Sequence, residues 1–302
     1  MESWLSALPH VIIMSAEFIT GIIVNGFLVI VNCSEFIKGR KLTSIQLLLI
    51  CIGMSRFGLL IILMLQSLFS VFFPFFYRTK IYGASMIFFW MFFNSVSVWF
   101  TTCLSVFYCL KISGFTQSYF LWLKFRTTKL MPWLLLGSLV SSVSMAALCH
   151  EVGYPKNVND DVLRNATRRK TEVMVKQVND MLLVNLALLV PLAIFVMCTV
   201  TLFISLYKHT HRMKMRAQEL RNASTEAHIN ALRTVVTFFC FFISYFAAFM
   251  TNMTFGIPYQ SQQFFVLKDI MAAYPSGHSV IIVLSNSKLQ QPFRRILCFQ
   301  RN

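Results

Sequence analysis

Seven long apolar stretches, separated by short polar segments, occupy nearly the whole 302-residue chain. They lie approximately at 9–34, 44–70, 83–112, 129–149, 179–207, 229–256 and 264–286. Each stretch supplies the roughly 20 apolar residues that a helix needs to cross a hydrocarbon core of about 30 Å. A helix satisfies its own backbone hydrogen bonds in lipid. The sequence therefore predicts an all-α fold: a polytopic membrane protein whose residues 1–302 form a single seven-transmembrane helix bundle.

The distribution of basic residues predicts how the chain lies in the membrane. With 57% hydrophobic and 13% charged residues, the chain would aggregate in water, so the lipid bilayer is its expected solvent. Seventeen of the 27 Lys and Arg residues follow the first, third, fifth and seventh stretches, against nine on the opposite side. Because cytoplasmic segments carry the excess of Lys and Arg, we expect a multi-pass plasma-membrane protein with an extracellular amino terminus and a cytoplasmic carboxy terminus. The net charge of +16 reflects this topology, and no nucleic-acid partner is expected.

The segments between the stretches predict three features outside the membrane. We expect a long extracellular loop at 150–178, a basic cytoplasmic loop at 208–228 and a short cytoplasmic tail at 287–302. Asn165 begins an Asn-Ala-Thr sequon in the extracellular loop and is the predicted glycosylation site. The eight cysteines show no zinc-binding spacing, so no metal and no cofactor are expected.

Polar residues of the third stretch recur at spacings of three and four, which places them along one helix face. These residues are Asn94, Ser97, Thr101, Ser105 and Tyr108. Trp90 comes one turn before Asn94, toward the extracellular mouth. A polar seam of this kind commonly joins neighbouring helices. At the mouth, a ligand-contact role for Trp90 and Asn94 is the alternative.

Arg56 is the only charged residue deep in the second stretch. A buried arginine needs acceptors, such as Asn25 of the first helix and the serines or carbonyls of the seventh. We interpret Arg56 as the centre of a conformational network; an ion pathway is the alternative, but no acidic relay partner lies at that depth. In the last stretch, Pro275 and Gly277 weaken the helix and permit a kink or an unwound turn.

Five segments resemble a known family. They are LSVFYCLKI at 104–112, FLWLK at 120–124, LFISLYKHT at 202–210, STEAHINAL at 224–232 and YPSGHS at 274–279. In this order and spacing they resemble the type 2 (bitter) taste receptors, which are seven-helix G-protein-coupled receptors, and the resemblance covers essentially the whole chain. The Asp-Arg-Tyr and Asn-Pro-x-x-Tyr motifs of rhodopsin-like receptors are absent from the corresponding positions.

The resemblance implies a receptor that binds small bitter molecules in an extracellular-facing pocket and activates a heterotrimeric G protein of the gustducin type. The implied pocket residues are Trp90, Asn94, Tyr245, Phe249, Lys268 and Met271. Lys268 and Asp269 are adjacent, so only one of them is expected to face inward. The implied conformational network comprises Asn25, Arg56, Tyr108, Pro275, His278 and Ser279. The implied G-protein contacts are Lys111, His209, Thr210, Arg212, Lys214, Arg216 and His228. Whether the chain forms a homo- or hetero-oligomer is left open.

Three other functional classes compete with this interpretation. Pro-Ser-Gly-His at 275–278 also occurs in membrane phosphatidic-acid phosphatases, but the accompanying Arg-Pro pair is absent and the one Ser-Arg pair precedes the motif. A transporter is disfavoured by the odd number of helices and the lack of an inverted repeat. Another chemosensory seven-helix receptor is the nearest alternative. We therefore expect no enzyme activity.

Overall fold

The computed structural model describes residues 2–39, 41–77, 79–112, 118–153, 166–216, 223–255, 257, 261–286 and 289–293. These residues form helices α1 (Glu2–Ile37), α2 (Ser44–Phe72), α3 (Pro74–Tyr77), α4 (Lys80–Ile112), α5 (Ser118–Gly153), α6 (Ala166–Arg216), α7 (Ala223–Thr254) and α8 (Gln262–Ser285). No strand occurs in these ranges. The predicted all-α fold is confirmed.

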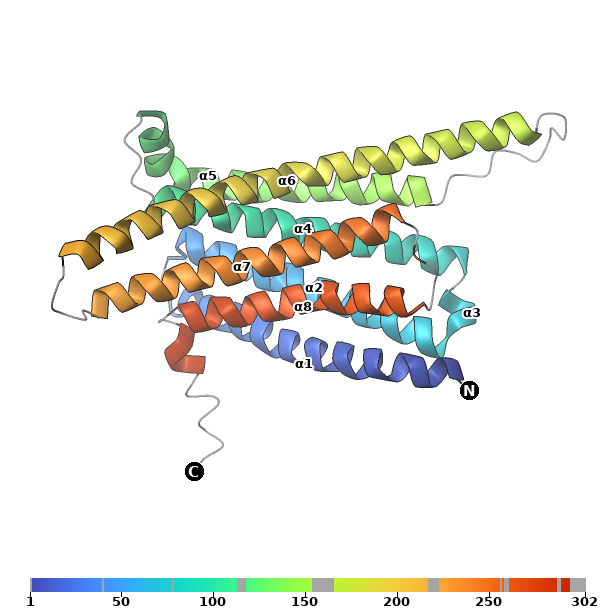
Figure 1. Cartoon of the computed structure of the whole chain (residues 1–302), viewed down its shortest axis with the longest axis horizontal. Helices are drawn as coiled ribbons and strands as arrows, with labels where there is room; N and C mark the ends of the chain where they lie inside the picture. Colours follow the sequence, from blue (N-terminus) through green and yellow to red (C-terminus); the bar gives the residue numbers. More distant parts are fainter. Residues whose placement is uncertain are drawn as a thin grey trace, which may run out of the picture.

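Seven of the helices run along the long axis of the molecule, and the one-turn α3 connects α2 to α4 (Figure 1). Within the described part of the chain, six helices (α1, α2 and α4–α7) are long and apolar enough to cross a membrane. The seventh, α8, has 24 residues and packs against α1, α2 and α7. The start of α1 and the end of α8 lie at opposite ends of the bundle, as an odd number of passes requires. We call these the amino-terminal end and the carboxy-terminal end.

Several helices continue beyond the apolar stretches. The helix expected at 179–207 begins at Ala166 and ends at Arg216, a length of 51 residues. The segments expected as loops at 150–178 and 208–228 are therefore largely helical: α5 continues to Gly153 and α7 begins at Ala223. Hydropathy marks where a helix is in lipid. It does not mark where the helix ends, because Lys, Arg, Glu and Gln are good helix formers in water.

α8 is continuous through Pro275 and Gly277, so the unwound turn that the sequence permits is not present. The Pro275 carbonyl accepts hydrogen bonds from Asn25 Nδ2 at 3.3 Å and Ser279 Oγ at 2.9 Å. Gly277 serves close packing, since a Cβ atom there would lie 2.8 Å from the Phe241 ring of α7.

Two large apolar clusters fill most of the bundle, and a smaller one contains Val71, Phe264 and Phe265. One of the two large clusters contains Trp90, Phe242, Phe249 and Met271, and the other contains Leu28, Ile52, Leu104 and Val283. Along α2, Arg56 lies between Ile52 of one cluster and Leu59 of the other. Large apolar side chains such as Trp133 and Met197 are 72% and 70% exposed, as is expected of a surface that faces lipid.

Candidate ligand site and buried polar network

A polar network lies in the middle of the bundle around Arg56, which is completely buried. Arg56 Nη1 donates to Ser279 Oγ at 2.8 Å, and Nη2 donates to Thr101 Oγ1 at 3.1 Å. Nη2 also donates to the Tyr274 hydroxyl at 3.4 Å and to His278 Nδ1. Because a guanidinium has no acceptor, His278 Nδ1 must accept, which places the proton of the neutral ring on Nε2. Arg56 thus ties α2 to α4 and α8.

Asn25 extends the network to α1. Its side-chain amide donates to the backbone oxygens of Gly21 at 2.8 Å and Pro275 at 3.3 Å. Its Oδ1 accepts from Ser279 Oγ at 2.7 Å. The structure thus brings together Asn25, Arg56, Pro275, His278 and Ser279. Tyr108 does not join them: it lies further along α4, where its ring packs against Phe107 at 6.1 Å between centroids.

The groups that accept hydrogen bonds from Arg56 are neutral hydroxyls and an imidazole. No carboxylate among the described residues lies within ion-pair distance of it, and its Nε atom has no hydrogen-bond partner there. Hydroxyl and imidazole acceptors compensate a buried cation less completely than a carboxylate would. The network is therefore sensitive to the loss of any one acceptor.

The six predicted pocket residues form a second assembly, which we call the aromatic cluster: Trp90, Asn94, Tyr245, Phe249, Lys268 and Met271. All six are between 1% and 7% exposed, so the cluster is closed to solvent. The Trp90 and Phe249 ring centroids lie 5.5 Å apart, and Tyr245 stacks on Phe249 at 6.3 Å. These rings come from α4 and α7, so the cluster joins two helices distant in sequence.

Some polar atoms in this cluster have no hydrogen-bond partner in the part of the chain that the structure describes. Both side-chain atoms of Asn94 that can form hydrogen bonds, Oδ1 and Nδ2, are buried and have no partner among the described residues, and neither has the Tyr245 hydroxyl. Buried polar groups in proteins are almost always hydrogen-bonded, and an unpaired one calls for an explanation. The polar groups of a bound ligand could supply these partners.

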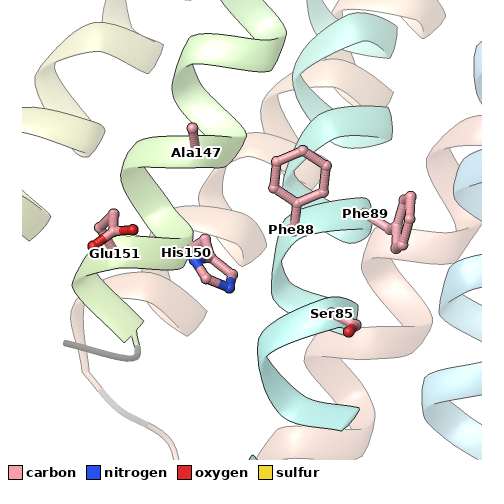
Figure 2. Close-up of a pocket in the computed structure, with 6 residues that line it drawn as sticks. All are labelled: Ser85, Phe88, Phe89, Ala147, His150 and Glu151. Atoms are coloured by element: carbon pink, nitrogen blue, oxygen red, sulfur yellow. The ribbon is translucent and has the colours of Figure 1, made fainter. Parts of the chain in front are cut away.

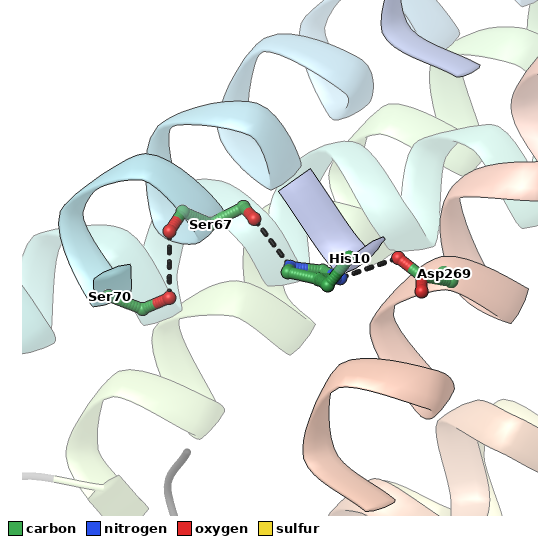
Figure 3. A network of polar contacts seen from close by, with 4 residues as sticks. All are labelled: His10, Ser67, Ser70 and Asp269. Atoms are coloured by element: carbon green, nitrogen blue, oxygen red, sulfur yellow. Dashed lines mark hydrogen bonds and ion pairs between the residues drawn. The ribbon is translucent and has the colours of Figure 1, made fainter. Parts of the chain in front are cut away.

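The side chains of Lys268 and Asp269 point into the bundle from different sides of α8. Lys268 points into the aromatic cluster, where Nζ lies 4.7 Å from the Trp90 ring centroid and donates to Gln66 Oε1 at 2.9 Å. Asp269 faces α1, where His10 Nδ1 donates to its Oδ1 at 2.6 Å (Figure 3). His10 Nε2 lies 2.6 Å from Ser67 Oγ of α2. The residue that faces the candidate pocket is therefore Lys268.

Comparison with known proteins places the chain in one family. Residues 1–301 match the family described as Taste receptor protein (TAS2R). The chain is 71% identical over 296 residues to taste receptor type 2 member 2 of Homo sapiens, covering 98% of each chain. The chain belongs to the type 2 taste receptor family. It is also 35% identical over 290 residues to member 7 of Macaca mulatta, covering 93% of this chain and 90% of the relative. Member 9 of Homo sapiens is 32% identical over 303 residues, at 96% and 93% coverage.

The chain is thus a bitter taste receptor that spans the membrane several times, and it is not an enzyme. The phosphatase interpretation of the motif at 275–278 is wrong. In this receptor, Ser276 is 4% exposed and bonds to the Glu17 backbone oxygen at 2.8 Å. His278, 2% exposed, is held by Arg56. Both side chains therefore serve helix packing.

Tyr274 connects the aromatic cluster to the Arg56 network, a role that we did not predict from sequence. Its ring lies 4.7 Å from the Tyr245 ring, and its hydroxyl donates to Thr101 Oγ1 at 2.8 Å. Tyr274 and His278 are four residues apart, so they share one face of α8. That spacing is the sequence feature from which the role of Tyr274 could have been predicted. Gln66 and His10 were also missed, because a polar residue in a span does not reveal its partner.

The receptor also has a cavity of about 340 Å³ between α4 and α5. Ser85, Phe88 and Phe89 line it from α4, and Ala147, His150 and Glu151 line it from α5 (Figure 2). None of these residues was predicted as a site. The cavity opens on the outside of the bundle, where Phe89 is 47% exposed, and it shares no lining residue with the aromatic cluster.

The residues that the family resemblance assigns to G-protein coupling lie on helices. His209, Thr210, Arg212, Lys214 and Arg216 belong to the last part of α6, and His228 belongs to the start of α7. The side chains of these six residues are outside the described part of the structure. Lys111 is exposed at the end of α4, with Nζ 5.4 Å from the Phe107 ring centroid. Asn165 lies outside the described residues.

Proposed function

We propose that this receptor binds small, mostly apolar bitter molecules within the aromatic cluster, reached from the extracellular, amino-terminal end. The buried polar atoms of Asn94 and Tyr245, which have no partner among the described residues, support this proposal. A ligand that packs against Trp90 and Phe249 would supply the missing partners. Pockets with aromatic walls and few polar groups suit ligands of varied structure. Because the cluster is closed, entry requires its side chains to move apart.

Ligand binding would act on the Arg56 network through Tyr274. A ligand that displaces the Tyr245 ring would also shift the Tyr274 ring that packs on it. The Tyr274 hydroxyl would then change its bonds to Thr101 and Arg56, which hold α2, α4 and α8 together. Rearrangement there would separate the last part of α6 from the start of α7, at the carboxy-terminal end of the bundle. A cleft for a G-protein α subunit of the gustducin type would open between them. Basic side chains at the end of α6 would pair with its acidic groups.

A calcium-mobilisation screen of bitter compounds tests this function. Cells would express the full chain together with a promiscuous G-protein chimera. We expect responses that require both the receptor and the chimera. Responses that persist without the chimera would contradict G-protein coupling and favour transport.

The orientation in the membrane predicts a pattern of antibody staining. The excess of basic residues at the carboxy-terminal end should keep that end in the cytoplasm. An epitope before Met1 should therefore be stained on intact cells, and one after Asn302 only after permeabilisation. The reverse staining pattern would contradict the orientation.

Asn165→Gln should remove a glycan-sized shift in electrophoretic mobility. A persisting shift would contradict the glycan assignment.

His209→Ala should strongly reduce G-protein activation while ligand binding stays near that of the wild type. His209 belongs to the LFISLYKHT segment shared with the family and lies where α6 would meet the G protein. Agonist-stimulated nucleotide exchange, normalised to surface receptor, measures the effect. His211→Ala is the matched control because His211 is an exposed histidine on the same helix. If His209→Ala, Lys214→Ala and Arg216→Ala all activate the G protein at full efficacy, the end of α6 is not the coupling surface.

A further inference from the structure

Lys268 is a buried cation that has no anionic partner. It is 7% exposed, and its ammonium group contacts the Gln66 amide oxygen and the faces of Trp90 and Phe264. None of the described carboxylates lies within ion-pair distance of Nζ. Neutral and aromatic acceptors compensate a desolvated charge only in part. The site therefore carries an uncompensated positive charge.

The two nearest acidic residues along α8 and α1 do not provide this counter-charge. Asp269 follows Lys268 in sequence, but its Oδ1 is held by His10 on the α1 side of the helix (Figure 3). Its carboxylate is thus committed to the contact between α1 and α8. Glu17 lies on α1, where its Oε2 atom is buried and makes no hydrogen bond to a described residue. Neither carboxylate reaches the Lys268 ammonium.

The aromatic cluster contains two further hydrogen-bond donors. Among the described residues, the Asn94 amide nitrogen and the Tyr245 hydroxyl are buried without partners. Asn94 lies one turn along α4 from Trp90, whose ring the Lys268 ammonium contacts, and Tyr245 stacks on Phe249. Each can donate a hydrogen bond. Trp90 and Phe249 provide aromatic faces 5.5 Å apart between centroids. The cluster thus combines one cation, two unpaired donors and flat apolar walls.

We propose that the ligands preferred by this receptor are aromatic anions, carboxylates or sulfonates, whose charged group pairs with Lys268. This inference rests on the proposed ligand site and adds the charge of the ligand to it. An anionic oxygen would accept from Lys268 Nζ in place of Gln66, and Asn94 or Tyr245 would donate to a second oxygen. The aromatic part would pack on Trp90 and Phe249. A neutral analogue of the same shape offers weaker acceptors and leaves the cation without a counter-charge.

Matched pairs of aromatic acids and their primary amides test the proposal. The probes are benzoate, 2-naphthoate and 2-anthroate, each compared with its amide, together with 2-naphthalenesulfonate. Binding to the purified full-length receptor is read from the shift in its melting temperature with ligand concentration, and signalling is read in cells. The variants are Lys268→Gln, which removes the charge, and Lys268→Arg, which keeps it. Lys38→Gln is the control, because it removes one lysine whose side chain is 65% exposed.

We expect the wild type and Lys38→Gln to bind at least one acid about tenfold or more tightly than its amide, the difference typical of a charged hydrogen bond. Lys268→Gln should lose this preference and Lys268→Arg should keep it. Equal binding of acids and amides by the wild type, an unchanged preference in Lys268→Gln, or no binding of any acid would overturn the charge assignment.

Trp90→Ala distinguishes a failure of the proposed charge preference from a failure of the proposed ligand site. If ligands bind with a dependence on Trp90 but not on Lys268, the aromatic cluster is the site and the charge preference is wrong. If binding depends on neither residue, the ligand site lies elsewhere, and both the proposed site and the proposed preference for anions are wrong.

Discussion

Arg56→Ala should destabilise the receptor severely and reduce its delivery to the cell surface. The substitution removes the donor shared by Thr101, Tyr274, His278 and Ser279 and leaves a cavity between two apolar clusters. A buried polar group left unsatisfied costs about 1–3 kcal/mol, and the cavity adds to this. We expect a total loss of about 3–5 kcal/mol in the free energy of unfolding. The melting temperature of the detergent-solubilised receptor and surface staining measure it.

Arg126→Ala is the matched control for this prediction. Arg126 is an exposed arginine on α5, with its guanidinium 5.0 Å from the Trp122 ring centroid. Its loss should change the stability by about 0.5 kcal/mol or less, as is usual for surface substitutions. If Arg56→Ala melts and reaches the surface like Arg126→Ala, the network does not hold the helices together.

The positions of the seven long helices along the chain could be predicted because they depend on one strong physical term. A helix in lipid must be predominantly apolar over about 20 residues, so the seven stretches could be located from residue type alone. The acceptors of Arg56 could be anticipated for a related reason. A charge in the bundle interior must find polar groups, and few spans offer them. Ser279 accordingly accepts from Arg56. Asn25, also expected as a direct acceptor, instead bonds to Ser279 and joins the network through it.

The ends of the helices and the rotation of α8 could not be predicted. α6 continues to Arg216 because its charged end is stable as a helix in water, where hydropathy carries no signal. Lys268 and Asp269 are neighbours with similar polarity, and their directions depend on partners from other helices. His10 of α1 binds Asp269, and Gln66 of α2 binds Lys268.

The placement of Tyr108 shows a further limit of periodicity. Its spacing puts it on the same face as Asn94 and Thr101, yet only Thr101 contacts Arg56. Spacing identifies a face of a helix, whereas contact also requires the correct depth in the bundle. Tyr274 joins the network because its side chain reaches both Tyr245 and Thr101.

Trp90→Ala should weaken agonists by about 1–3 kcal/mol, a loss of about tenfold or more in potency. The substitution removes a ring that packs on Phe249 and receives the Lys268 ammonium. Trp90 is 4% exposed and lies at the candidate ligand site, so its loss removes contact area from a bound ligand. Trp133→Ala is the control, because Trp133 is 72% exposed on the outer surface of α5.

The most direct test of the ligand site is a dose–response measurement of G-protein activation for Trp90→Ala and Trp133→Ala, at equal surface expression. The proposed site predicts that the curve of Trp90→Ala moves to about tenfold or higher agonist concentrations, while that of Trp133→Ala coincides with the wild type. Curves of Trp90→Ala that coincide with the wild type for every agonist would contradict a ligand site in the aromatic cluster.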